Sequence, residues 1–476
     1  MGSNWKTTKL LDHYDIRSGL SKPAKDFGSG YPFLTFKDVF YNYFTPDILG
    51  DLVQSNDKER ASSSVKRGDV FLTRTSETMH ELGMSCVALK DYENSTFNGF
   101  CKRLRPHKES ELVPEYVGYY LRSSKFRQSM LAFSTMSTRA SLNNEMIGRL
   151  EISYPSKNEQ LKIAKILKTL DDKVALNRQI NQTLEQMAQA LFKSWFVDFD
   201  PVVDNALDAG FFELDLAFPD ELLRRAEARR AVRERGDFKP LPEATRQLFP
   251  AAFEECSEPF LGLGGWLPQG WKIAMLDEIT CELRRGVSPK YVEEGGVQVI
   301  NQKCIRNHEV SYEPARRHNH EAKKIDGREL CIGDVLVNST GVGTLGRIAQ
   351  VTHLPETTVV DSHVTVVRVK DDVCPIYTFG QLMLSMEGKI EQLGEGSTGQ
   401  TELSRKILSE QLVILPPFDI AAHVEKTFKS LSEKQVSNRK QCSTLTNLRD
   451  TLLPKLISGE LRLDQIEAGL AKEGMA

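Results

Sequence analysis

Three glycines in the stretch NSTGVGTLGRIAQV, residues 338–351, have the spacing of a nucleotide-binding turn. Gly341, Gly343 and Gly346 form the pattern G-x-G-x-x-G, in which a turn brings the backbone close to a pyrophosphate at the start of a helix. The stretch also resembles a phosphate-binding P-loop, but it lacks the Lys-Ser/Thr pair of that motif. The residues after Gly346 read RIAQV, which is short and strand-like. We therefore expect a tight connection between two strands, and the alternative is a nucleotide-binding enzyme that uses the Gly341–Gly346 loop.

No second motif in the 476 residues offers catalytic chemistry. The chain contains no D/N-P-P-Y/F methyltransferase tetrad and no convincing carboxylate–lysine nuclease cluster. Its eight cysteines are scattered without a C-x-x-C pair, which in a chain of this length indicates reduced thiols rather than disulfides or a zinc site. No apolar run approaches the roughly 18 residues that cross a membrane. The sequence therefore predicts a cytoplasmic protein with no membrane partner and no catalytic or metal site of its own.

The charge of the chain is uneven. A formal net charge of -3 does not by itself indicate nucleic-acid binding. Residues 1–155 contain 21 Lys and Arg against 18 Asp and Glu, whereas residues 200–265 contain 8 against 14. The run DELLRRAEARRAVRERGDF in the second range is rich in both signs, so we expect a solvated helix or mobile segment there, with a basic nucleic-acid-binding patch as the alternative.

Two halves of the sequence repeat each other. VKRGDVFLTRTS, from Val65, matches LCIGDVLVNSTG, from Leu330, and in each a Gly-Asp pair leads into a short apolar strand. WKTTKLLDHYDIRSGLSK, from Trp5, matches WKIAMLDEITCELRRGVSPK, from Trp271. The helix-like segments VPEYVGYYLRSSKFRQSM and CPIYTFGQLMLSMEGKIEQL match later in each half. A repeat of this length predicts two related globular units that are rich in short strands.

Each half ends in a long amphipathic helix. From Ile163 onward, one face recurs at alternating spacings of four and three residues, a 3.5-residue period typical of a left-handed coiled-coil seam. Adding 261 gives a second seam from Val424, which is polar near its middle. Because a lone seam would leave an apolar stripe in water, we expect the two helices to pair antiparallel.

The expected seam includes two asparagines, Asn177 and Asn438, near the helix midpoints. We expect them to approach each other and fix the register, and the alternative is that both face solvent. The residues that we expect to pair the helices are Leu167, Leu170, Asn177, Leu184, Leu191, Phe428, Leu431, Asn438, Leu445 and Leu452.

These stretches resemble type I restriction–modification specificity subunits. KNEQLKIAKILKTLDDKVALNRQINQTLEQMAQALFKSWFVDFDPV is similar to the central conserved region of that family, and RDTLLPKLISGELRL is similar to the distal one. FPAAFEECSEPFLGLGGWLPQGWKI resembles the segment between the repeats, and GDVLVNSTGVGTLGRIAQV resembles a strand–loop–strand of a target-recognition domain. The resemblance covers nearly the whole chain, although PPFDIAAHVEKTF, from Pro416, lacks the Glu-Gln pair found at Glu159 and Gln160.

The resemblance implies a mixed α/β (α+β) fold with two pseudo-repeated target-recognition domains joined by two long antiparallel coiled-coil helices. The expected division is a first target-recognition domain at 1–155, the central helix at 156–199, a linker or variable segment at 200–265, a second target-recognition domain at 266–415, the distal helix at 416–463 and a tail at 464–476.

The resemblance also implies a DNA-reading function. Each target-recognition domain would read one half of a split, asymmetric site in double-stranded DNA, and the paired helices would set the spacing. The helices would dock two modification subunits, which carry S-adenosylmethionine and methylate adenine, and up to two restriction subunits, which use ATP and Mg, could join. The chain itself would be non-catalytic, without a cofactor, in the cytoplasm of a bacterium or archaeon. A coiled-coil scaffold that assembles proteins without reading DNA is the alternative.

Base recognition favours Arg or Lys for guanine, Asn or Gln for adenine, and Ser or Thr as adaptable partners. On loops that follow strands, the candidates in the first half are Ser21, Lys22, Lys37, Arg74, Thr75, Ser76, Thr138 and Arg139. In the second half they are Arg285, Lys290, Gln302, Lys303, Asn338, Ser339, Thr340, Arg347, Gln400 and Thr401. Matching positions pair Arg74 with Ser339, Thr75 with Thr340, Arg139 with Gln400, and Gly83 with Gly346. For any one candidate, the alternatives are an exposed loop residue or a phosphate contact that positions the duplex without specifying sequence.

Overall fold

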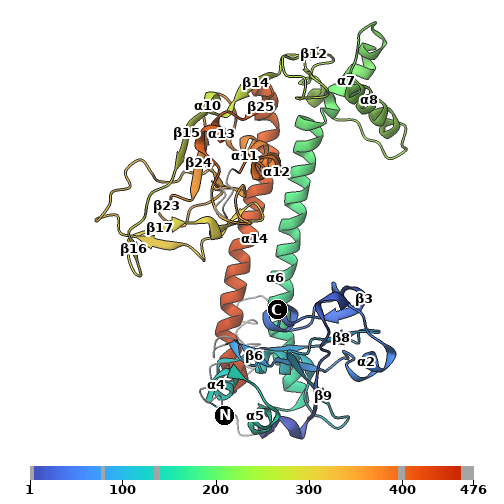
Figure 1. The fold of residues 1–476 in the computed structure, drawn as a ribbon, viewed down its shortest axis with the longest axis vertical. Helices are drawn as coiled ribbons and strands as arrows, with labels where there is room; N and C mark the ends of the chain where they lie inside the picture. Colours follow the sequence, from blue (N-terminus) through green and yellow to red (C-terminus); the bar gives the residue numbers. More distant parts are fainter. Residues whose placement is uncertain (1–4, 77–80, 133–139, 395–401, 462–476) are drawn as a thin grey trace, which may run out of the picture. The chain divides into compact units, whose positions relative to one another are not determined.

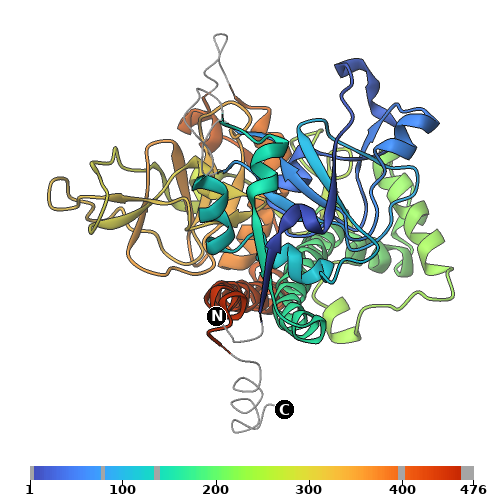
Figure 2. The same ribbon diagram turned by 90° about the horizontal axis from the view of Figure 1, so that it is seen from below.

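A computed structural model describes residues 5–76, 81–132, 140–394 and 402–461, and Figures 1 and 2 show its fold. The chain forms two compact units, the first from residues 1–177 with 441–476 and the second from residues 178–440. Two long helices, α6 (Lys157–Phe192) and α14 (Phe418–Ser458), each contribute a stretch to both units. Within the described ranges, no helix combines the length and apolar character needed to cross a bilayer. Four predicted DNA-binding residues lie outside those ranges: Thr138, Arg139, Gln400 and Thr401.

The first unit is built on an antiparallel sheet in the order β2-β9-β5-β7. Its strands are Tyr14–Ser18, Cys101–Pro106, Val70–Thr73 and Ser85–Val87. A sheet in the order β4-β3-β8 contains Asp51–Val53, Phe27–Leu34 and Thr96–Phe97. Two strand pairs join β1 (Lys6–Lys9) to β11 (Glu151–Tyr154) and β6 (Thr75–Ser76) to β10 (Ala140–Ser141). The helices are α1 (Phe36–Tyr41), α2 (Asp57–Ser62), α3 (Pro114–Tyr120), α4 (Ser124–Ala132) and α5 (Asn144–Arg149).

The second unit repeats the main sheet as β15-β24-β21-β22, with strands Thr280–Arg285, Val364–Val369, Val335–Asn338 and Ile348–Gln350. A mixed sheet in the order β16-β20-β17-β23 contains Tyr291–Val292, Arg316–His318, Val297–Ile300 and Thr358–Val360. Two strand pairs join β14 (Lys272–Met275) to β25 (Leu412–Leu415) and β18 (Ile305–Arg306) to β19 (Glu309–Val310). The helices of this region are α10 (Leu276–Ile279), α11 (Ile376–Ser385), α12 (Glu387–Glu391) and α13 (Arg405–Ser409).

The repeated Gly-Asp pair starts the equivalent central strand of each main sheet. Gly68 and Gly333 have left-handed φ values of 88° and 99°, a conformation that favours glycine. Asp69 follows and is fully buried, where it accepts hydrogen bonds from Arg105 of the neighbouring β9 at 2.6 and 2.7 Å. Asp334 in the second unit accepts in the same way from Arg368 of β24. The predicted internal repeat is therefore confirmed as a turn with a buried Asp–Arg pair.

The long helices also cap the short helix that follows the main sheet in each unit. In the first unit, the fully buried Gln160 accepts from the backbone N–H of Val113, the N-cap of α3, at 2.9 Å. In the second, Glu425 accepts from the N–H groups of Tyr377 and Thr378 at the start of α11, at 3.0 and 2.7 Å. Acceptors at a helix N-terminus satisfy donors that lack partners within the helix. The Glu-Gln pair missing after Pro416 is thus replaced by an acidic residue further along α14.

The two long helices pair antiparallel within each unit, as predicted. In the first unit, Asp171 of α6 pairs with Arg449 of α14 at 2.6 Å, whereas Asn177 donates to Gln441 at 2.7 Å. Positions rise along α6 as they fall along α14, which defines the antiparallel direction. All ten residues expected at the seam are buried or half-buried: Leu167, Leu170, Asn177, Leu184, Leu191, Phe428, Leu431, Asn438, Leu445 and Leu452.

The two asparagines do not make the contact that we expected. Asn177 bonds Gln441 in the first unit, whereas Asn438 donates to Asn181 at 2.8 Å in the second. Both side chains are buried, at 1% and 3% exposure, so the solvent-facing alternative is wrong as well. Each asparagine therefore has its own polar partner across the seam, which is consistent with a role in register.

Residues 200–265 are folded, which corrects the expectation of a linker. They contain α7 (Asp200–Asp208), α8 (Asp220–Arg233), α9 (Glu243–Arg246) and β12 (Phe253–Glu255), which pairs with β13 (Trp266–Pro268). The segment follows a π-helical turn, Lys193–Val197, at the end of α6. Its aromatic side chains pack in one core with that turn, and the buried aromatics of this core include Phe196, Phe199, Phe211, Phe249, Phe253, Trp266 and Trp271. A core of this kind orders the segment because burying large aromatic surfaces is strongly favourable.

Candidate nucleic-acid interface

In the first unit, three chain segments meet where β5 ends. Arg74 follows this strand, and its backbone N–H donates to the carbonyl of Phe100 at 2.7 Å. Its own carbonyl accepts from the N–H of Leu142 at 2.8 Å. The end of β5, the turn before β9 and the segment after β10 are thereby joined at Arg74.

The second unit has the same junction at the end of β21. Ser339 donates its backbone N–H to the carbonyl of His363 at 2.9 Å. Its carbonyl accepts from the N–H of Leu403 at 2.9 Å. The predicted match of Arg74 with Ser339 is confirmed by these bonds, and the same bonds match Phe100 with His363.

The next residue along each chain also matches. Thr75 pairs with Ser141 in the β6–β10 ladder, and Thr340 forms an isolated bridge with Glu402. The predicted correspondence of Thr75 with Thr340 therefore holds in backbone pairing. We call this shared arrangement the strand-end frame, made of residues 73–76, 98–100 and 140–142 in the first unit and 338–341, 361–363 and 402–403 in the second.

The glycine pattern serves this frame. Gly341, Gly343 and Gly346 have φ values of 105°, 71° and 83° in the connection from β21 to β22. A nucleotide-binding turn would lead into a helix, whereas this one leads into a strand, as predicted. Gly346 donates to the carbonyl of Asn338 at 2.8 Å, and Gly83 donates in the same way to Thr73 at 3.2 Å. A Cβ on Gly346 would lie 2.5 Å from the Cα of Glu391, so the position requires glycine for space as well as for φ.

Three polar side chains from separate segments meet at the frame of the second unit. Thr340 donates from Oγ1 to Oε1 of Gln302 at 3.3 Å, and the same oxygen lies 2.8 Å from Nδ1 of His363. Gln302 begins the short 3-10 helix Gln302–Cys304 after β17. The structure thus brings together two of the predicted residues, Gln302 and Thr340, with an exposed histidine.

Burial removes two residues from the predicted base-reading set. Asn338 and Ser339 are both 0% exposed. The Asn338 amide donates to the carbonyl of Gln302 at 3.1 Å, and the Ser339 hydroxyl lies 2.6 Å from that of Thr365. Their side chains hold the frame together from inside, which corrects the expectation that they face DNA.

Three predicted cations are held by partners within the chain. Arg285 pairs with Glu402 at 2.9 Å and donates to the carbonyl of Leu403 at 2.7 Å, and burial lowers its pKa. Lys22 pairs with Glu59 at 2.8 Å. Arg347 donates to the carbonyl of Gly343 at 2.7 Å. Because these side chains are already bonded within the chain, they are better suited to holding the loops in place than to contacting DNA freely.

The other candidates lie nearer to solvent. Ser21, Lys37, Arg74, Lys290 and Lys303 are exposed, and Thr75, Gln302 and Thr340 are half-buried. The backbone of Ser76 pairs with Ala140. Arg74 is the cation of the first frame, and within the described residues its guanidinium forms no hydrogen bond or ion pair.

Sequence reasoning missed Phe100, His363 and Lys102. A readable signal exists, because FNGFCKRLR and VDSHVTVVRV each place a turn directly before the repeated strand. The two turns differ in residue type, so their equivalence is not apparent from the sequence. Lys102 donates to the hydroxyl of Ser18 at 3.0 Å, and burial together with the charge of Arg74 lowers its pKa.

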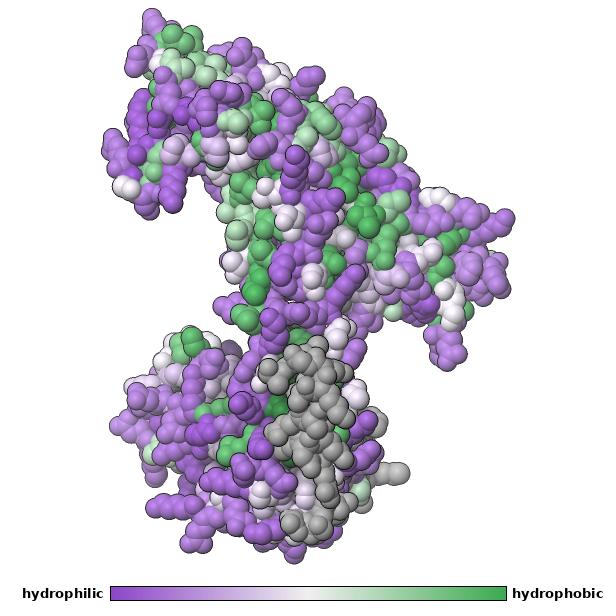
Figure 3. Space-filling view, turned by 180° about the vertical axis from the view of Figure 1, so that it is seen from behind, coloured by the Kyte–Doolittle hydropathy of each residue, from purple (hydrophilic) through white to green (hydrophobic). Residues whose placement is uncertain are grey.

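Hydrophilic residues cover much of the face that Figure 3 shows, with apolar residues exposed between them in the upper part of the view. Among the residues that the structure describes, no group of three or more His, Cys, Asp and Glu is placed to hold a metal ion. The polar loops at the strand-end frames are the candidate functional site, because they bring predicted residues such as Gln302 and Thr340 together.

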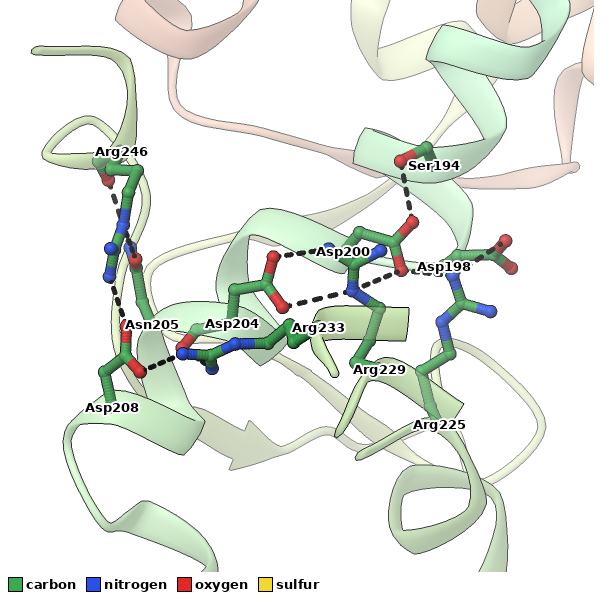
Figure 4. A network of polar contacts seen from close by, with 10 residues as sticks. All are labelled: Ser194, Asp198, Asp200, Asp204, Asn205, Asp208, Arg225, Arg229, Arg233 and Arg246. Carbon is green, nitrogen blue, oxygen red and sulfur yellow. Dashed lines mark hydrogen bonds and ion pairs between the residues drawn. The ribbon is translucent and has the colours of Figure 1, made fainter. Parts of the chain in front are cut away.

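The arginine run of α8 is engaged in a ladder of ion pairs (Figure 4). Asp200, Asp204 and Asp208 of α7 pair in turn with Arg225, Arg229 and Arg233, and Arg246 reaches Asp208 at 2.6 Å. Both sets advance by four residues, so the two helices run parallel and present matching faces. The expected helix with a solvated face is therefore present, but its other face pairs with α7, which leaves Arg225, Arg229 and Arg233 unsuited to a nucleic-acid patch.

Arg229→Ala is expected to destabilise the second unit by about 2–3 kcal/mol, because it leaves the half-buried Asp204 and the buried Asp200 without a shared partner. Arg229 Nε donates to Asp204 at 3.1 Å, and the two side chains are only 14% and 17% exposed. Chemical unfolding of the purified chain measures the change. Arg230→Ala on the exposed side is the matched control and should shift stability by less than about 0.5 kcal/mol. Equal losses from both variants would contradict the ladder's role.

Comparisons with known proteins agree on one family. The family model described as "Type I restriction modification DNA specificity domain" matches residues 2–186. The type I restriction enzyme HindI specificity subunit of Haemophilus influenzae is 28% identical over 96% of this chain and 100% of its own length. The MjaIX specificity subunit of Methanocaldococcus jannaschii is 23% identical over 97% and 95%. The crystal structure of a type I system S subunit from M. genitalium is similar in fold, with a TM-score of 0.52 and 14% identity over 96% and 97% of the two chains.

Proposed function

The chain belongs to the family of type I restriction–modification specificity subunits, and we propose that its two strand-end frames read the two halves of a bipartite, asymmetric site in duplex DNA. The observation that carries this proposal is one backbone frame that occurs twice with different side chains. Arg74 matches Ser339, and Phe100 matches His363, within the same set of backbone hydrogen bonds. Two readers of shared geometry and different chemistry suit a site whose halves differ in sequence.

The paired helices are proposed to set the distance between the half-sites and to dock two modification subunits. Their continuous lengths, 36 and 41 residues, correspond to roughly 54 and 62 Å at 1.5 Å per residue. A duplex presents equivalent faces about every 34 Å, so helices of this length can separate two readers on one DNA molecule. Up to two restriction subunits would join the same assembly.

The chemistry is proposed to lie in the partner subunits. The modification subunits would supply S-adenosylmethionine for adenine methylation, and the restriction subunits would use ATP and Mg. This chain would contribute sequence recognition without a cofactor or catalytic step of its own, in the cytoplasm of its host.

Reconstitution with the modification subunits and S-adenosylmethionine tests the proposal, with methylated sites mapped by sequencing. We expect adenine methylation at a split motif with two defined halves, and none without this chain. A continuous palindrome would contradict the two-reader arrangement. A motif that survives exchange of either strand-rich domain would favour the scaffold alternative, and tight binding of ATP or NAD by the chain alone would favour the nucleotide-binding one.

Arg74→Ala is expected to weaken DNA binding by the assembled complex, by about 1–3 kcal/mol if the guanidinium makes a bidentate base contact. Discrimination should be lost within the first half-site alone, and competition binding with variant duplexes measures this. Arg149→Ala removes an exposed arginine that pairs with Glu145 on α5, and it should leave binding unchanged. Equal affinity of wild type and Arg74→Ala for all duplexes would remove Arg74 from the interface.

A further inference from the structure

Both units hold an aromatic ring at the same point of the strand-end frame. In the first unit the residue is Phe100, whose side chain is 63% exposed, and in the second it is the exposed His363. The carbonyl of each accepts from the residue that follows the central strand, Arg74 or Ser339. The ring position is therefore defined by the backbone of the repeat.

The turn that carries the ring is fixed in the same way in both units. The N–H of Phe100 donates to Oδ1 of Asn98 at 2.8 Å, and the N–H of His363 donates to Oδ1 of Asp361 at 2.9 Å. In each case a side chain two residues earlier holds the turn, as in an Asx-turn. The backbone N–H and the carbonyl of the ring residue are both hydrogen-bonded in each unit. The exposed ring is therefore presented to solvent from a fixed backbone.

A glycine packs beneath each of these turns. A Cβ on Gly19 would lie 2.2 Å from the carbonyl oxygen of Asn98, and a Cβ on Gly286 would lie 2.2 Å from that of Asp361. In both units, the segment that packs against the turn therefore has no room for a side chain at this glycine. The repeat preserves the support of the ring while the ring itself changes from phenyl to imidazole.

The hydrogen bonds around His363 determine whether its second ring nitrogen, Nε2, donates or accepts a hydrogen bond. Thr340 has a single hydroxyl proton, and Oε1 of Gln302 can only accept, so this proton goes to Gln302. Nδ1 of His363 must then donate to Thr340 Oγ1. In the neutral imidazole the other nitrogen, Nε2, is consequently an acceptor, and within the described residues it has no hydrogen-bond partner.

The ring in the first unit has different neighbours and different chemistry. Phe100 can make only apolar contacts, and its backbone lies next to those of two basic residues. The backbone N–H of Arg74 donates to the Phe100 carbonyl, and Lys102 follows two positions later, close enough to Arg74 for the pKa of Lys102 to be lowered. Cations next to an apolar side chain suit a DNA groove, where phosphates flank the base edges. The major groove presents amino donors on adenine and cytosine and a methyl group on thymine.

We propose that this ring position is a specificity-determining position of both recognition domains. His363 accepts a hydrogen bond from the exocyclic amino group of adenine or cytosine in the second half-site, whereas Phe100 contacts the methyl group of thymine in the first. This inference rests on the proposed function and adds to it the identity of one reading residue per half and the base chemistry that each reads.

The test uses the complete complex with modification subunits, acting on a DNA library with each position of the wild-type motif randomised. His363→Ala is expected to lower discrimination roughly ten- to a hundredfold at one base pair of the second half-site, with the first half-site unchanged. Phe100→Ala is expected to relax one thymine-containing pair of the first half-site alone. Since both side chains are exposed, folding and assembly should be preserved, which thermal unfolding and gel filtration check.

Thr340→Val tests whether Thr340 fixes the tautomer of His363. The measurement is a change in which bases are accepted, which a purely structural role of Thr340 would not produce. Without the hydroxyl, Nδ1 of His363 is no longer held as a donor, so Nε2 can also present a proton. The affected position should then accept guanine or thymine, which offer acceptors, in addition to the original donor base. Unchanged motifs in His363→Ala and Phe100→Ala would overturn the inference. A wild-type complex without any split motif would instead overturn the proposed function, so the two failures are distinguishable.

Discussion

Asp69→Ala is expected to lower the free energy of unfolding of the first unit by about 3–5 kcal/mol. Its carboxylate is fully buried and accepts two hydrogen bonds from Arg105 and one from the backbone N–H of Lys66 at 2.8 Å. Removing it leaves the partly buried Arg105 with hydrogen bonds to Ser64 alone among the residues that the structure describes. Breaking a buried pair costs more than the pair contributes, because an uncompensated charge stays behind.

The equivalent change in the second unit, Asp334→Ala, is expected to cost less. Arg368 also contacts Glu282 at 3.1 Å, so its charge retains a partner after Asp334 is removed. Hydrogen exchange can assign each loss to its unit, and denaturant unfolding gives the magnitude. Asp51→Ala and Asp372→Ala replace exposed aspartates in the two units and should change stability by less than about 0.5 kcal/mol. Losses no larger than these controls would contradict the structural role of the repeated Asp.

The Gly-Asp turns show what the sequence makes readable. A glycine with positive φ and an aspartate at a strand start leave a local pattern, and its recurrence at Gly333 identified the repeat. The seam of α6 was readable for the same reason, since a 3.5-residue period marks one face of a helix. The residues that face each other across the seam could not be predicted, because the periodicity of each helix does not fix the axial position of one helix along the other. Asn177 therefore meets Gln441 rather than Asn438.

The burial of a side chain by segments far along the chain could not be predicted from the sequence. Ser339 looked like an exposed residue after a strand, but Leu403, far along the chain, bonds its carbonyl and helps to enclose it. The same limit applies to the α8 arginines. Their four-residue spacing matches that of Asp200, Asp204 and Asp208, yet a charged run reads as solvated until the parallel packing of α7 on α8 is known. Local patterns were thus reliable for elements and repeats, and unreliable for which polar side chains remain free.

A histidine turn within the second unit makes its stability depend on pH. Asn307 and His308, with φ values of 52° and 60°, form the two-residue turn of the β18–β19 hairpin, as a left-handed turn requires. Nδ1 of His308 lies 3.1 Å from Glu185 of α6, and Nε2 lies 3.3 Å from Glu387 of α12. Hydrogen bonds to these carboxylates raise the pKa of His308 to about 9 from its ordinary value of 6.5, despite burial. Gln189 of α6 also contacts the ring at 2.9 Å.

Stability of the second unit is expected to fall as pH rises through about 9. Because the folded-state pKa is raised, the stabilisation is complete below about pH 6.5, declines above it, and is lost once His308 is neutral. A shift of this size corresponds to about 3 kcal/mol for a largely buried group. Unfolding measured from pH 6 to 10, in steps of roughly one unit, should show this decline in wild type and a flatter profile in His308→Asn, since Asn tolerates the left-handed turn. His320→Asn, at an exposed histidine of the same domain, should follow wild type, and a decline that persists in His308→Asn would assign the pH dependence to another group.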